Sequence, residues 1–173
     1  MYPEQFDKEH HIVVDPDVHA PRKCPIHLKD ELKSELDKML TIDVIRKVTE
    51  PTDWVNSLTY SRKANGEIRV CLDPKDLNKA IKRNHHKTPT LEELTHKFRE
   101  ARFFSKLDAK SGYWAVKLDK ESQLLTTFNS PFGRFCFKRM PFGLVMSQDV
   151  FQHKMDQILE RCPGTIGIAD YVA

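Results

Sequence analysis

The 173-residue sequence lacks the features that mark several classes of protein. No apolar run approaches the roughly 20 residues that a membrane-spanning helix requires, so we expect no membrane partner. The start, Met1-Tyr-Pro-Glu-Gln5, has no basic segment followed by an apolar core and therefore does not resemble a signal peptide. Internal repeats and low-complexity segments are also absent. The sequence predicts an intracellular protein and does not choose between cytoplasm and nucleus.

Cysteine is scarce and scattered. The chain has four cysteines, at Cys24, Cys71, Cys136 and Cys162. None of them forms a C-x-x-C pair of the kind that structural zinc sites use. The adjacent His10 and His11 have no cysteine or carboxylate at the spacing of a metal site. We therefore expect reduced thiols and no zinc.

The composition is that of a soluble globular protein, with 39% hydrophobic and 31% charged residues. A chain of this length can bury roughly 70% of its unfolded surface in one domain. Prolines and turn-forming residues concentrate in residues 1–26, which we expect to form an extended N-terminal arm. Residues 27–173 are then the single folded domain.

Positive charge is unevenly distributed along the chain. Residues 1–60 hold 8 basic and 12 acidic side chains, whereas residues 61–90 hold 8 basic and 3 acidic ones. A local excess of five positive charges is typical of a segment that faces a polyanion, because phosphate neutralisation requires clustered Lys and Arg. A solvated hairpin surface explains the same charge equally well.

Hydrophobic periodicity predicts the N-terminal half of the domain. An apolar stripe that starts at Leu28 and ends at Leu40 predicts an amphipathic helix packed on a core. Residues 55–60 and 67–72 read as two strands joined at Asn65-Gly66, which is a strong hairpin signal. Residues 76–81 predict one helical turn, and a basic link follows it. Thr90 and Glu93 form a capping box that predicts a further helix ending near residue 101.

The C-terminal half reads as short strands followed by one helix. We expect strands over residues 103–108, 114–118, 124–128 and 134–138, with short connections that favour an antiparallel sheet. Ser147 is the expected N-cap of a helix that runs to about Cys162. Pro163-Gly164 ends that helix, and residues 165–169 predict a final strand. The fold class is therefore α+β.

Two aspartates end apolar runs in this half. Asp108 follows Phe103-Phe-Ser-Lys-Leu107, and Asp170 follows Ile166-Gly-Ile-Ala169. On adjacent strands the two carboxylates could hold metal ions together.

Four motifs carry a resemblance to a known family. They are Arg69-Val-Cys-Leu-Asp-Pro-Lys-Asp-Leu-Asn78, Phe104-Ser-Lys-Leu-Asp-Ala-Lys-Ser-Gly-Tyr113, Phe132-Gly-Arg-Phe135 and Arg139-Met-Pro-Phe-Gly-Leu144. In order and spacing they resemble the reverse transcriptases of gypsy-type LTR retrotransposons, over roughly residues 20–173. The resemblance implies a right-hand polymerase whose fingers contain the first helix, the hairpin and the basic link. The later strands and helix form the palm, and the thumb is absent.

The resemblance implies a two-magnesium centre. Asp108 corresponds to the first catalytic aspartate, which would bind both Mg²⁺ ions at a separation of about 3.5–4 Å. By the same resemblance, Asp170 would be the second catalytic and metal-binding residue. The partners implied are an RNA or DNA template–primer and deoxynucleoside triphosphates, with other segments of a retroelement polyprotein as further partners.

The resemblance also implies a nucleotide site. Arg69 matches the fingers arginine that contacts the incoming triphosphate, with Lys63 as its companion, since a planar guanidinium can bond two phosphate oxygens. Ser111 and Gly112 would present backbone groups to the triphosphate. Tyr113 matches the aromatic residue under the sugar that leaves no room for a 2′-hydroxyl. On the residues alone, Arg69 can also be an exposed strand cation and Tyr113 a core aromatic.

The loop at Phe142 and Gly143 completes the implied site. In the family it contacts the new base pair and the template. Val145 stands two residues later, where we expect a lysine. This substitution weakens the case for a template contact at that position.

The largest departure from the family is at Tyr171. The family pattern has two consecutive aspartates on a hairpin turn, whereas Asp170 is followed here by a phenol that is neutral near pH 7. The sequence also predicts that the second strand of this hairpin is missing. Two functions stay open: an RNA-directed DNA polymerase with impaired activity, and a non-catalytic retroelement-derived fragment that binds nucleic acid.

Overall fold

The computed structural model describes residues 11, 28–63, 66–83, 86, 102–103, 105–168 and 171–172. Most of the predicted N-terminal arm, the tip of the hairpin, the helix predicted from the Thr90 capping box, and Asp170 lie outside the described residues. In the described part of the chain, no helix is long and apolar enough to cross a membrane.

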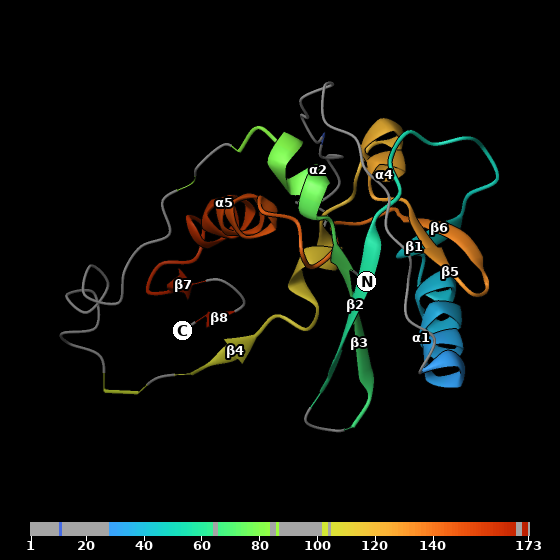
Figure 1. Ribbon diagram of the computed structural model, residues 1–173. Coiled ribbons are helices and arrows are strands. Elements are labelled where there is room, and N and C mark those ends of the chain that lie inside the picture. Colours follow the sequence, from blue (N-terminus) through green and yellow to red (C-terminus); the bar gives the residue numbers. More distant parts are fainter. Residues whose placement is uncertain are drawn as a thin grey trace.

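A long antiparallel hairpin stands at the centre of the molecule (Figure 1). Its strands are β2 (Ser57–Arg62) and β3 (Ile68–Asp73), paired in register from Ser57 opposite Asp73 to Arg62 opposite Ile68. Alternation along β3 buries Ile68, Val70 and Leu72 and leaves the residues between them more accessible. The hairpin predicted from the sequence is therefore confirmed.

One side of the hairpin carries α1 and a three-stranded sheet (Figure 1). Helix α1 (Lys29–Thr41) buries Leu32, Leu36 and Met39, which confirms the predicted apolar stripe. The sheet has the order β1-β6-β5, with β1 at Ile45–Lys47, β5 at Phe128–Ser130 and β6 at Gly133–Phe137. Its stacked Phe128 and Phe135 are almost inaccessible to solvent.

The other side carries α5 and a second small sheet (Figure 1). Helix α5 (Ser147–Leu159) lies against β7 (Gly167–Ile168), and the strand order is β4-β8-β7, with β4 at Leu107–Asp108 and β8 at Tyr171–Val172. The sequence predicts that the strand before Asp170 has no hairpin partner. This prediction is wrong, because β8 pairs with β7 and lies between β7 and β4. Helix α2 (Lys75–Ala80) confirms the predicted helical turn after the hairpin.

The predicted strands over residues 114–118 and 124–128 are wrong in their first two residues, which are helical, although Lys117 makes a β-bridge to Arg139 and Phe128 begins β5. Residues 112–115 form the 3₁₀ helix η3 (Gly112–Ala115), which follows Ser111 in the left-handed backbone region. Residues 120–125 form α4 (Lys120–Leu125), because Asp119 caps its N-terminus by accepting a hydrogen bond from the Ser122 N–H. The hydroxyls of Thr126 and Thr127 donate to helix carbonyls at its other end, so these β-branched residues terminate a helix.

Two further predictions need correction. Of the predicted strand over residues 103–108, only Leu107 and Asp108 are paired among the residues described there, and Phe103 is 94% exposed. Ser147 is not the N-cap of α5, since Met146 holds that position. The Ser147 hydroxyl donates instead to the Pro141 carbonyl at 2.9 Å, which ties the helix start to the preceding loop.

Candidate nucleotide-binding cleft

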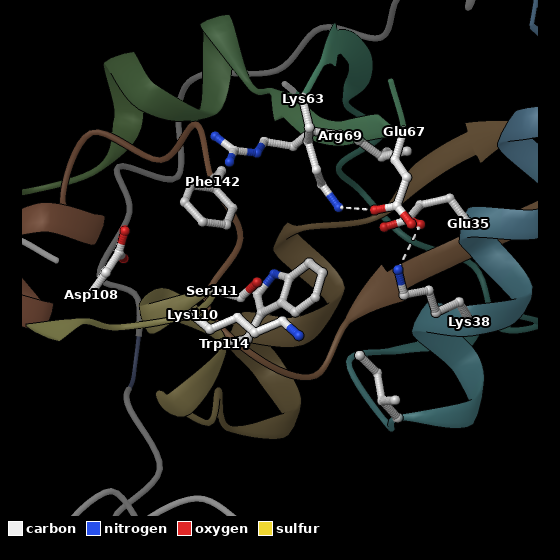
Figure 2. Close-up of a pocket in the computed structure, with 12 residues that line it drawn as sticks. Glu35, Lys38, Lys63, Glu67, Arg69, Asp108, Lys110, Ser111, Trp114 and Phe142 are labelled. Atoms are coloured by element: carbon white, nitrogen blue, oxygen red, sulfur yellow. Dashed lines mark hydrogen bonds and ion pairs between the residues drawn. The ribbon is translucent and has the colours of Figure 1, made fainter. Parts of the chain in front are cut away.

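A cleft of about 790 Å³ opens between the hairpin, α1 and the segment after β4 (Figure 2). Five residues predicted for the nucleotide or metal site line it. They are Lys63, Arg69, Asp108, Ser111 and Phe142. The structure thus brings together residues that lie up to 79 positions apart in the sequence.

Besides Lys38 on α1, three cations reach the cleft from separate segments. Lys63 follows β2, Arg69 projects from β3 and Lys110 follows β4. The Arg69 guanidinium lies 5.4 Å from the centre of the Phe142 ring, within the range of a cation–π contact. Such an arrangement attracts an anion of high charge density and holds one guanidinium in a defined place.

The cleft also contains acids that the sequence did not point to. Glu35 is only 9% exposed and pairs with Lys38 on the same helix at 3.6 Å. Glu67 pairs with Lys63 at 3.0 Å (Figure 2). A nucleotide phosphate that contacts Lys63 therefore competes with a carboxylate already in place. Only long-range packing reveals Glu35, because α1 reads as an ordinary surface helix.

Asp108 is exposed at the end of β4 and faces the cleft. The antiparallel register places the Cα of Tyr171 directly opposite that of Asp108. The strands predicted to end at Asp108 and Asp170 are β4 and β7, which belong to one small sheet. The expectation that they are adjacent is wrong, because β8 lies between them. Asp170 itself lies outside the described residues. Among the residues that are described, no group of three or more His, Cys, Asp or Glu side chains could hold a metal ion.

The segment after Asp108 turns sharply. Ser111 has a φ of 54°, and the Gly112 N–H donates to the Ala109 carbonyl at 3.1 Å. This bond uses the Gly112 amide within the turn, so a triphosphate that bonded it would have to share it. Tyr113 is half-buried, with its ring 4.8 Å from that of Phe142 and 5.5 Å from that of Phe151. Tyr113 therefore packs on the core as well as beside the cleft.

The loop at Phe142 and Gly143 lies against β3 at very short range. Gly143 has a φ of +108°, and a Cβ atom there would lie 2.0 Å from the Leu72 carbonyl oxygen. The Leu72 N–H donates to the Phe142 carbonyl at 3.1 Å. Only glycine permits both the backbone angle and the approach. Gly112, Tyr113 and Gly143 do not line the cleft but shape the backbone beside it.

Ion pairs reduce the positive field of the 61–90 segment. Four cations in the described part of this segment have acidic partners. The Arg83 pair is bidentate, and the hydrogen bonds to Asp149 raise the pKa of that guanidinium. The pairs are Arg62 with Glu31, Lys63 with Glu67, Lys79 with Asp76, and Arg83 with Asp149. Net charge counted along the sequence therefore overstates the charge offered to a polyanion.

A family model described as reverse transcriptase (RNA-dependent DNA polymerase) matches residues 61–172. The chain belongs to the reverse transcriptase family. It is 34% identical over 133 residues to the putative enzymatic polyprotein of Cassava vein mosaic virus, covering 77% of this chain and 20% of that polyprotein. It is 36% identical over 129 residues to the enzymatic polyprotein of Figwort mosaic virus (strain DxS), covering 75% and 19%. This reverse transcriptase chain thus spans about a fifth of these curated relatives.

Solved reverse transcriptases share the fold. A crystal structure of Prototype Foamy Virus protease-reverse transcriptase superposes with a TM-score of 0.82 at 22% identity, over 95% of this chain and 22% of that one. The foamy viral enzyme in complex with an RNA/DNA hybrid gives a TM-score of 0.78 at 20% identity, over the same shares of the two chains. The predicted α+β fingers and palm architecture is therefore confirmed.

Proposed function

We propose that this chain is the template–primer-binding and nucleotide-binding fingers and palm of a reverse transcriptase, with nucleotidyl transfer impaired at position 171. The observation that carries the proposal is the cleft, which gathers Lys63, Arg69 and Lys110 in the same cavity as Asp108. Cations facing a carboxylate at the end of a strand suit a ligand that carries both phosphate and a metal ion.

Arg69 is the residue we assign to the triphosphate. Its guanidinium has a fork of donors that matches two phosphate oxygens, and it is held against the face of the Phe142 ring. Lys63 is the second phosphate ligand once it exchanges its ion pair with Glu67. Ser111, Gly112 and Tyr113 border the sugar and phosphate positions, while Phe142 and Gly143 lie next to the base pair.

The described residues do not complete a two-magnesium centre. Asp108 supplies one carboxylate, and the position opposite it in the sheet holds Tyr171, whose phenol is a weak ligand near pH 7. We propose a single Mg²⁺ or Mn²⁺ ion at Asp108 and Asp170. Calorimetric titration with Mn²⁺ should show binding that Asp108→Asn abolishes, and binding that is unchanged in this variant would contradict the assignment.

A second candidate function follows from Tyr171. A chain that lacks one of the paired aspartates can retain nucleic-acid binding without polymerase activity, as a retroelement-derived binding protein. Both candidates predict that template–primer binds through the basic hairpin and the basic segment that follows it. They differ in whether a primer is extended.

Nucleic-acid binding is tested by its dependence on salt. If cations of the basic 61–90 segment neutralise two or three template–primer phosphates, the affinity for poly-rA/oligo-dT should fall about 10- to 40-fold between 50 and 200 mM salt. Filter binding measures this slope directly. An affinity that is constant over this range would show that phosphate contacts do not hold the complex.

Triphosphate binding is tested at Arg69. With Mn²⁺ and a dideoxy-terminated poly-rA/oligo-dT duplex, dTTP should bind roughly 10- to 100-fold more weakly to Arg69→Ala, because charge-assisted hydrogen bonds contribute about 1.5–3 kcal/mol. Arg161→Ala is the matched control, since Arg161 is exposed beyond the end of α5. Equal dTTP affinities for the natural chain and Arg69→Ala would contradict the proposal.

A further inference from the structure

Asn78 on α2 makes a two-point contact with the loop that carries Phe142. Its side-chain Nδ2 donates to the Gly143 carbonyl at 2.9 Å, and its Oδ1 accepts from the Val145 N–H at 2.9 Å. The amide thus satisfies a backbone acceptor and a backbone donor two residues apart. Asparagine suits this position because its short side chain presents a donor and an acceptor at once.

The same loop is held from a second direction by β3. The Leu72 N–H donates to the Phe142 carbonyl, and Gly143 lies against the Leu72 carbonyl with no room for a side chain. Strand β3 and helix α2 are consecutive elements, and together they fix the backbone from the Phe142 carbonyl to Val145. The ring of Phe142 then has a defined position beside Arg69 and against Tyr113.

We propose that Asn78 is a positioning residue that clamps residues 143–145 so that the Phe142 ring holds Arg69 in the orientation that receives a triphosphate. The inference rests on the proposed nucleotide-binding function and adds a residue that does not line the cleft. It also gives Val145 a role through its backbone N–H, which any residue except proline supplies at this position.

The clamp itself is tested by amide hydrogen exchange. In Asn78→Ala, the Val145 N–H loses its acceptor, and its protection against exchange should fall about tenfold. Asn78→Asp keeps the acceptor for the Val145 N–H and removes only the donor to the Gly143 carbonyl, so Val145 protection should fall less than in Asn78→Ala. Asn129→Ala is the control, because Asn129 is exposed on β5 opposite Arg134. Unchanged Val145 protection in Asn78→Ala would overturn the clamp.

The action through Arg69 is tested by a double-mutant cycle on dTTP affinity, measured with Mn²⁺ and a dideoxy-terminated duplex. Asn78→Ala should weaken dTTP binding about tenfold in the natural chain and less than twofold in the Arg69→Ala background. A general loss of structure would weaken binding equally in both backgrounds, and that additive result would overturn the inference. If the natural chain binds no dTTP, the proposed function fails together with the nucleotide role of Asn78, whatever the exchange data show.

Discussion

Gly143→Ala is the substitution that should damage the cleft most through the backbone alone. A φ of +108° costs an L-residue about 1–3 kcal/mol. The added methyl would lie 2.0 Å from the Leu72 oxygen, so the loop must move away from β3. That movement breaks the two hydrogen bonds that the Phe142 and Gly143 carbonyls accept from Leu72 and Asn78, at about 1 kcal/mol each. We expect a total loss of about 3–5 kcal/mol in the free energy of unfolding.

Urea denaturation followed by circular dichroism measures this loss. With a slope of about 2 kcal/mol per molar urea, the midpoint should fall by roughly 1.5–2.5 M. Gly133→Ala is the matched control: Gly133 has a φ of +115°, but a Cβ atom added there would meet no other atom within 4 Å. Gly133→Ala should therefore show only the cost of the backbone angle. Equal midpoints for the two variants would refute the claim that the approach to Leu72 requires glycine.

Two further predictions concern single ionisable groups. Asp119→Ala should lower the free energy of unfolding by about 1 kcal/mol at pH 7, because it removes the N-cap of α4. Burial works to raise the pKa of Asp119, but hydrogen bonds from Ser122 and His11 outweigh it and lower the pKa. The difference between variant and natural chain should therefore be present at neutral pH and shrink as acidification takes the pH through the lowered folded pKa. A difference that does not shrink on acidification would argue against the cap. Burial raises the pKa of Cys136 to about 11, so iodoacetamide at pH 8 should modify exposed Cys162 well before Cys136. Mass spectrometry measures the order of modification, and the reverse order would contradict the packing of β6.

The sequence predicted the elements whose signals are local. Alternation and Asn65-Gly66 were sufficient for the hairpin, and the apolar stripe was sufficient for α1. The errors arose where local signals conflict with tertiary structure. Thr126 and Thr127 have high β-propensity, yet their hydroxyls donate hydrogen bonds to backbone carbonyls in the last turn of α4. The left-handed turn at Ser111, a serine rather than a glycine, was not predictable from pattern.

Part of the cleft was predictable from the sequence, because some of its residues lie in local sequence motifs. The motifs that carry Arg69, Asp108 and Phe142 contain residues that line it. Glu35 and Asn78 were missed as site residues because their roles depend on how α1 and α2 pack against distant segments. Periodicity assigns a residue to a face of a helix, but it does not say which loop that face meets.

The most direct test of the account is primer extension on poly-rA/oligo-dT with Mg²⁺, comparing the natural chain with Tyr171→Asp. The register places position 171 opposite Asp108, so the substitution returns a carboxylate to that position of the sheet. Electrostatic groups of this kind contribute about 3–4 kcal/mol to a transition state, so the rate should rise roughly 10²- to 10³-fold. Adding Asp108→Asn to Tyr171→Asp should remove the gain. Equal extension rates for the natural chain and Tyr171→Asp would contradict the claim that Tyr171 separates this chain from the polymerase activity of its family.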